Sequence, residues 1–151
     1  MRRQSCRSFL TGAAALTIFA GCALAANHHE LNGTWQLIPS RSEFHEEPVI
    51  ESGTITINDR ESNIYVSRNF TYQGANQSTT SSFSTDSREN TIIKNPGVTS
   101  KSKWEGGVLK VTTTREGITT VERYSLRGDG SMVLMIDRPR RALETLVFQR
   151  Q

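Results

Sequence analysis

The sequence predicts an all-β protein with a single antiparallel up-and-down barrel of about eight to ten strands. Three observations support this fold class. Short runs of alternating apolar and polar residues recur through most of the chain after residue 31. Turn-forming residues separate these runs at a spacing of about ten residues, as in a meander of short strands. No stretch of this region has a long helical period.

Four strands are predicted in the first half of the domain. Residues 34–38 open it, and residues 54–57 alternate Thr and Ile. Ile64, Val66 and Phe70 share one face of the next run. Residues 78–85 are rich in Ser and Thr, and because Thr favours extended backbone we expect a strand here as well.

The second half contains the clearest hairpins. Alternation is evident in residues 108–114, 118–126, 131–136 and 142–150. Gly, Asn and Asp tolerate the positive φ that tight turns need. The predicted turns are Asn58-Asp59, Gly74-Ala75-Asn76, Asp86-Ser87, Asn95-Pro96-Gly97, Glu105-Gly106-Gly107, Glu116-Gly117 and Gly128-Asp129-Gly130.

One insert interrupts the meander. Residues 39–48 follow the first strand, begin and end with Pro, and form either a loop or a single helical turn. A meander this regular is expected to close into a barrel, because closure removes exposed strand edges. Such a barrel has room for its own side chains or for one small ligand.

The N-terminus has the pattern of a signal peptide over residues 1–25. Arg2, Arg3 and Arg7 precede an apolar run, and Ala23-Leu24-Ala25 supplies a cleavage site. The apolar run is too short for a stable membrane span. We therefore expect an exported protein, periplasmic or secreted, with a short polar leader at 26–31 and one domain at 32–151. The pattern leaves the export route open between the general and the twin-arginine pathways.

A second interpretation of the same segment is a lipoprotein signal. Ile18-Phe19-Ala20-Gly21-Cys22 resembles a bacterial lipobox, in which Cys22 is lipidated and becomes the first residue. Membrane association is expected only in that case. Cys6 and Cys22 are the only cysteines, so a domain starting at residue 26 has no disulfide and no thiol chemistry.

The net charge of +3 belongs to the signal segment. Fifteen of the 18 Lys and Arg residues lie after Ala25, as do all 15 Asp and Glu, so the remaining domain is formally neutral. A neutral domain has no overall field to attract polyanions, which argues against nucleic acid as a partner. We expect a monomer.

Two blocks of sequence resemble small exported bacterial lipocalin-like proteins. The first is Asn32-Gly33-Thr34-Trp35-Gln36-Leu37 followed by Ser40-Arg41-Ser42-Glu43-Phe44, and the second begins at Lys103-Trp104-Glu105-Gly106-Gly107. The resemblance implies a β-barrel and little about chemistry. The C-terminal half is also similar to fatty-acid-binding proteins of the calycin group. That family holds the ligand carboxylate with an Arg-x-Tyr on the last strand, where this chain has Leu146 and Phe148.

A barrel of this kind is expected to bind a small, largely apolar ligand in its interior. Arg68, Arg123 and Arg138 are candidates for holding a polar ligand end. Arg123 shares a strand face with Val121 and is the preferred anchor. The other candidate lining residues are Trp35, Phe70, Phe83, Trp104, Tyr124 and Phe148. The alternative is a ligandless envelope module that acts through its surface, with its interior filled by its own side chains.

The sequence contains no recognisable catalytic set or cofactor motif, so we expect a protein that is not an enzyme and needs no cofactor. One metal site is conceivable. If cleavage follows Ala25, the new terminus is Ala26-Asn27-His28. Its amine, two amides and the His28 imidazole then form a square-planar nitrogen set that suits Cu(II) or Ni(II).

Overall fold

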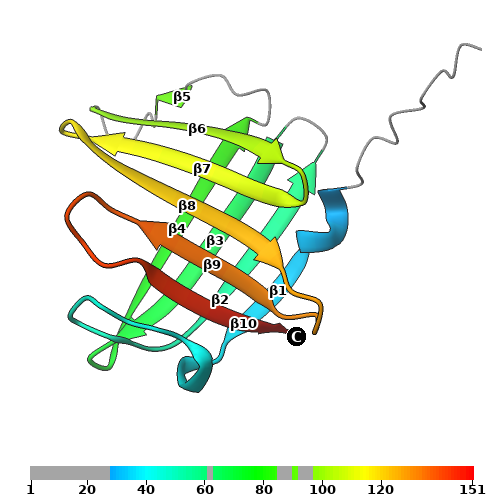
Figure 1. Cartoon of the computed structure of the whole chain (residues 1–151), viewed down its shortest axis with the longest axis vertical. Coiled ribbons are helices and arrows are strands. Elements are labelled where there is room, and N and C mark those ends of the chain that lie inside the picture. The colour runs from blue at the N-terminus through cyan, green and yellow to red at the C-terminus, as the bar shows by residue number, and fades with distance from the viewer. Residues whose placement is uncertain (1–27, 61–62, 85–89, 92–96) are drawn as a thin grey trace, which may run out of the picture.

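The computed structural model describes residues 28–60, 63–84, 90–91 and 97–151 as one antiparallel β-barrel (Figure 1). The predicted signal segment, including Cys22, lies outside these residues. In chain order the elements are η1 (His28–Leu31), β1 (Gly33–Leu37), η2 (Pro39–Arg41), β2 (Ile50–Arg60), β3 (Asn63–Tyr72), β4 (Ala75–Ser84), β5 (Asn90–Thr91), β6 (Val98–Glu105), β7 (Val108–Arg115), β8 (Ile118–Leu126), β9 (Met132–Asp137) and β10 (Glu144–Arg150).

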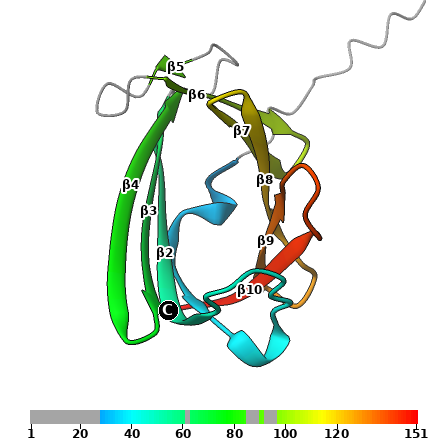
Figure 2. The ribbon, with the colours of Figure 1, turned by 90° about the vertical axis from the view of Figure 1, so that its left-hand side faces the viewer.

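The strands pair in the order β4-β3-β2-β1-β10-β9-β8-β7-β6-β5, every pair antiparallel. The predicted up-and-down barrel is therefore confirmed. β1 pairs with both β2 and β10, so the two ends of the domain meet in the middle of the sheet. Figure 2 shows the resulting two layers, with β2–β4 facing β7–β10.

The barrel is nearly closed along a seam between β4 and β6. Within the described residues no ladder joins these strands, but the Ser102 hydroxyl donates a hydrogen bond of 2.8 Å to the backbone oxygen of Ser84. Serine therefore supplies across this seam a bond that the backbone ladder supplies elsewhere.

Several predicted turns are confirmed. Gly74 and Gly117 have φ values of 75° and 79°, which residues with a side chain rarely adopt. The turn predicted at Asn58-Asp59 is wrong, because β2 continues to Arg60. Asp59 stays in the ladder opposite Ile64, and its backbone N–H also donates to the Asn32 side chain at 2.6 Å. The predicted turns at residues 86–87 and 95–96 lie outside the described residues.

The insert at 39–48 contains a single 3-10 turn, η2, and then a loop. Glu43 exchanges two backbone hydrogen bonds with Thr145, of 2.7 and 3.1 Å, which tie the loop to β10. The Ser42 hydroxyl also accepts the backbone N–H of Val147 at 2.9 Å. The loop consequently lies across one end of the barrel, at the bottom of Figure 2.

The 3-10 turn η1, immediately before β1, packs against the barrel. Leu31 at the end of η1 is buried, and its carbonyl accepts a 2.9 Å hydrogen bond from the Trp35 indole. Arg150 lies 4.3 Å over the Trp35 ring and donates to the carbonyls of Glu30 and Asn32, each at 2.6 Å. In the described part of the chain, no helix has the length and apolar character to cross a bilayer.

The barrel interior holds the hydrophobic core. Inward-facing side chains from both layers fill it, among them the fully buried Trp35, Tyr124 and Phe148. Aliphatic side chains occupy the space between them, including Ile55, Ile57, Ile64, Leu109, Leu134 and Leu146. Much of the interior is therefore already packed with protein atoms.

Candidate functional site

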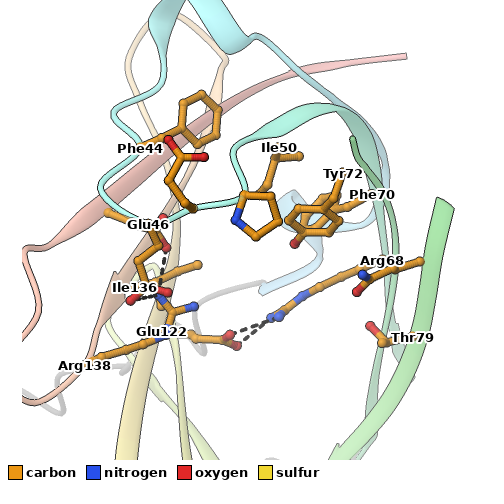
Figure 3. Close-up of a pocket in the computed structure, with 14 residues that line it drawn as sticks. Phe44, Glu46, Ile50, Arg68, Phe70, Tyr72, Thr79, Glu122, Ile136 and Arg138 are labelled. Carbon is orange, nitrogen blue, oxygen red and sulfur yellow. Dashed lines mark hydrogen bonds and ion pairs between the residues drawn. The ribbon is translucent and has the colours of Figure 1, made fainter. Parts of the chain in front are cut away.

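A pocket of about 270 Å³ remains at the end of the barrel under the loop that follows η2 (Figure 3). It lies between the ends of β3 and β4 on one side and β8–β10 on the other. Its lining combines aromatic, aliphatic and charged side chains: Phe44, Glu46, Glu47, Pro48, Ile50, Arg68, Phe70, Tyr72, Gln77, Thr79, Glu122, Ile136, Arg138 and Glu144.

An ion pair between Arg68 and Glu122 crosses the base of this pocket. Arg68 comes from β3, where Ile64, Val66 and Phe70 point into the core, so strand alternation directs Arg68 inward as well. Its guanidinium donates to both oxygens of Glu122 on β8, at 3.0 and 2.5 Å. The two side chains are 23% and 13% exposed. The pair thus joins the two layers from inside the barrel, as the dashed lines in Figure 3 show.

The Tyr124 hydroxyl completes this polar group. It accepts a hydrogen bond from Arg68 and donates one of 3.3 Å to Glu122. Burial raises the pKa of Tyr124 above its ordinary value. Burial alone would lower the pKa of Arg68, but the attraction of Tyr124 and Glu122 outweighs it and raises that pKa. Arg68 therefore stays charged and Tyr124 stays protonated at neutral pH.

A second arginine at the pocket is also balanced by carboxylates. Arg138, just after β9, lies 2.8 Å from Glu144 and 3.2 Å from Glu46. Glu144 faces inward at the start of β10 and its side chain is only 8% exposed. The lining thus has two arginines and four glutamates, counting Glu47. Neither arginine is left without a carboxylate partner.

Aromatic rings connect the pocket to the core. Phe70 packs edge-on against Tyr72, with ring centroids 6.3 Å apart, and stacks on Phe148 at 6.5 Å. Burial is also the main cause of the raised pKa of Tyr72. The wall is therefore apolar on the Phe70 side and charged on the Glu122 side.

The structure separates the candidate ligand-binding residues into different environments. Phe70 lines the pocket. Trp35, Tyr124 and Phe148 belong to the packed core beneath it, and Phe83 and Trp104 also contact that core. Of the three candidate arginines, Arg68 and Arg138 lie at the pocket.

Arg123 faces the opposite way. Its neighbours Glu122 and Tyr124 alternate around it, and Tyr124 is in the core, so Arg123 lies on the outer surface opposite Lys110 and Met135. Arg123 therefore does not point into the barrel, and the arginine that does is Arg68, which pairs with Glu122. Sequence reasoning did not identify Glu122, Glu144, Phe44 or Tyr72.

The described residues contain no group of three or more His, Cys, Asp or Glu side chains placed to hold a metal ion. The conceivable copper site at His28 is not tested, because Ala26 and Asn27 lie outside the described residues.

In fold, the barrel resembles those of fatty-acid-binding proteins. No protein-family model matches the sequence, and no curated protein matches it. Solved structures do match in fold. The fluorescent protein UnaG superposes with a TM-score of 0.62 at 14% identity, covering 80% of this chain and 96% of UnaG.

Two further solved structures have the same fold. A secretary abundant heat soluble protein from Ramazzottius varieornatus matches with a TM-score of 0.64 at 13% identity, covering 81% of this chain and 96% of that one. Fatty-acid-binding protein 1 of Echinococcus granulosus matches at 0.59 and 13% identity, covering 81% and 98%. At these identities the similarity establishes the fold alone.

Proposed function

We propose that this protein binds a small, largely apolar ligand in the pocket at the end of its barrel, without catalysing a reaction. The observation that carries the proposal is the combination of an unfilled volume of about 270 Å³ with one aromatic wall and one polar wall. Ligand sites in proteins typically have this composition, with apolar contacts for affinity and a few polar groups for orientation.

The size of the pocket limits the ligand. Pockets for small molecules typically span about 300–1,000 Å³, so a volume of about 270 Å³ is just below this range. The core below is filled by Trp35, Tyr124 and Phe148. A compact ligand, or one end of a longer chain, therefore fits better than a long chain enclosed along its whole length.

The charges of the pocket favour a neutral polar end on this ligand. A free carboxylate would have to compete with Glu122 for Arg68 or with Glu144 for Arg138, and it would approach four glutamates. A hydroxyl or carbonyl group can hydrogen-bond to the existing pairs without displacing a charge.

Solved structures of the same fold include a Schistosoma mansoni fatty-acid-binding protein in complex with arachidonic acid, at 16% identity with a TM-score of 0.56, covering 81% of this chain and 96% of that one.

The alternative is the ligandless envelope module. The packed core favours it, because most of the interior leaves no room for a ligand. The pocket favours binding, because a module that acts only through its surface has no need of an inward, partly desolvated arginine. Desolvating an ion pair in this way carries a cost.

For location, we propose export by the signal segment at residues 1–25, to the periplasm or the medium. Lipidation of Cys22 is the alternative that would anchor the protein to a membrane. A Cys22→Ser variant distinguishes the two, since loss of membrane fractionation on substitution supports lipidation, and unchanged solubility supports cleavage after Ala25. Copper binding by His28 follows only from that cleavage, and a His28→Ala variant titrated with Cu(II) tests it.

Binding is tested with an environment-sensitive apolar dye and two competitors of equal chain length, decanol and decanoate. We expect one dye per protein, displaced more readily by decanol. Native mass spectrometry of protein from its own cells then tests for a co-purified small molecule.

A matched pair of variants locates the binding. Thr79 faces the pocket from β4, whereas Thr80 is opposite Ser67 on the outer side of the same strand. Thr79→Phe should fill the pocket and abolish dye binding, and Thr80→Phe should leave it unchanged. Absence of dye binding by the folded protein, or equal binding by both variants, would favour the ligandless module.

A further inference from the structure

The outer surface of β6, β7 and β8 carries a row of cations. Lys103 on β6 is directly opposite Lys110 on β7, and Lys110 is directly opposite Arg123 on β8. Lys101 is two residues from Lys103 and therefore on the same face. We call these four residues, Lys101, Lys103, Lys110 and Arg123, the outer basic cluster.

This arrangement is unfavourable for the sheet by itself. Like charges directly opposite on neighbouring strands destabilise a ladder. One carboxylate compensates, because Glu105 lies 2.6 Å from the Lys103 ammonium and 3.3 Å from that of Lys110. In the described portion of the chain, neither Lys101 nor Arg123 has a carboxylate within ion-pair distance. Four cations therefore surround one anion, although the domain as a whole is neutral.

Protection of a sheet edge explains only part of this cluster. Lysines on edge strands discourage pairing with other molecules, and β6 is nearly an edge because β5 has two residues. Lys110 and Arg123, however, lie on β7 and β8, which are paired on both sides. Edge protection gives no reason for cations on those inner strands.

A hollow lies among the same side chains. Its volume is about 300 Å³, and it is lined by Lys101, Ser102, Lys103, Lys110 and Thr112. Each lysine ammonium carries three hydrogen-bond donors, and the Thr112 hydroxyl adds another. The hollow thus presents hydrogen-bond donors and the positive charge of three lysines. Its lining residues include neither the carboxylates nor the aromatic rings that line the pocket at the end of the barrel.

We propose that the hollow in the outer basic cluster is a second binding site, which takes a phosphate-bearing anion of at least two negative charges. Such an anion relieves the repulsion among Lys103, Lys110 and Arg123 and hydrogen-bonds to the ammonium groups that border the hollow. Its phosphates are either free in solution or part of a lipid headgroup. The site is independent of the ligand proposed for the barrel.

The test compares Lys110→Gln with Arg127→Gln. Both variants lose one positive charge, but Arg127 is exposed in the loop between β8 and β9, outside the cluster. Inorganic pyrophosphate is titrated calorimetrically into the full-length protein and each variant at about 20 mM salt, where screening is weak. One lost ion pair of about 1 kcal/mol corresponds to about fivefold in affinity. We therefore expect about fivefold weaker binding for Lys110→Gln and an unchanged affinity for Arg127→Gln.

The second measurement identifies the source of the phosphate. Sedimentation with vesicles of equal parts phosphatidylglycerol and phosphatidylcholine is compared with vesicles of phosphatidylcholine alone. Binding that requires phosphatidylglycerol, is lost in Lys110→Gln and is competed by pyrophosphate supports a lipid headgroup. Pyrophosphate binding without vesicle binding supports a soluble anion.

Thermal unfolding distinguishes a binding role of Lys110 from a purely structural one. If Lys110 only stabilised the fold, its substitution would lower the melting temperature. Lys110→Gln should melt at the same or a higher temperature than the wild type, because it removes cross-strand repulsion. A lower melting temperature with unchanged pyrophosphate affinity overturns the proposal. So does equal weakening in Lys110→Gln and Arg127→Gln, or failure of the wild type to bind either pyrophosphate or the anionic vesicles.

Discussion

The ion pair inside the pocket makes a quantitative prediction about stability. Arg68→Met removes the guanidinium and leaves the Glu122 carboxylate 13% exposed without a cation. At an effective dielectric constant of about 20, opposite charges about 4 Å apart attract by about 4 kcal/mol. Desolvation offsets part of this attraction in the wild type, so we expect Arg68→Met to cost about 3 kcal/mol. Adding Glu122→Gln removes the unpaired charge and keeps an acceptor for Tyr124, and should restore about 2 kcal/mol.

Urea unfolding of the wild type, both single variants and the double variant measures these free energies as a double-mutant cycle. With a slope of about 2 kcal/mol per molar urea, Arg68→Met should shift the midpoint down by about 1.5 M. The double variant should lie within about 1 kcal/mol of the wild type. Two results would refute the interpretation of this pair as a partly desolvated unit. One is a loss of less than about 1 kcal/mol in the free energy of unfolding of Arg68→Met. The other is a double variant that is no more stable than Arg68→Met.

Three further predictions concern packing and pH. An ideal Cβ at Gly53 would lie 2.2 Å from the Phe70 ring and 2.9 Å from the Asn69 carbonyl; Gly53→Ala should therefore cost about 1–3 kcal/mol in urea unfolding and weaken dye binding, and wild-type values for both would contradict the packing. Hydrogen bonds from Ser131, followed by that from Arg41, lower the pKa of Asp129, so the stabilisation by this carboxylate is present above about pH 4 and is lost as the pH falls. Between about pH 5 and 2 the Asp129→Asn variant should therefore lose less stability than the wild type. Parallel stability profiles of the two proteins would count against this role of Asp129. Burial raises the pKa of Tyr124, so the stabilisation by its protonated hydroxyl is present below about pH 10 and is lost as the pH rises further. Above about pH 10 the melting temperature of Tyr124→Phe should fall less steeply with pH than that of the wild type. An equal fall in both proteins would mean that Tyr124 ionises as easily in the folded state as in the unfolded state.

The fold was predictable because barrel topology is determined by local signals. Alternating runs and turn residues at short intervals permit few arrangements other than a meander, and the strands pair in sequence order on each side of β1. Local signals failed where a tertiary contact competes with them. Asn58-Asp59 has turn composition, yet β2 continues through it because Asn32 satisfies the Asp59 backbone N–H and Ile64 completes the ladder.

Closure at the β4–β6 seam has a different origin. A ladder partner can be inferred from alternation and turn length, but the bond from Ser102 to the Ser84 carbonyl depends on how far the two edges approach in the folded barrel. The same limit applies to the loop after η2. Its composition predicted a loop or a single helical turn, whereas its position over the pocket follows from the Glu43–Thr145 bridge, which joins residues distant in sequence.

The candidate site depends on which residues of each strand face the barrel interior. The apolar neighbours along a strand indicate this better than the type of the charged residue does. Because successive side chains alternate between faces, a shift of one residue exchanges Glu122 for Arg123. Val121 marks Arg123 as inward, whereas Tyr124 marks Glu122 as inward, so β8 is ambiguous by itself.

On β3 the evidence is one-sided, since Ile64, Val66 and Phe70 share the face that includes Arg68. An inward arginine needs a carboxylate across the interior, because an unpaired buried charge is too costly. That requirement selects Glu122 over Arg123 on β8. Placing one charged residue by its apolar neighbours thus determines the face of a second strand that its own sequence leaves undecided.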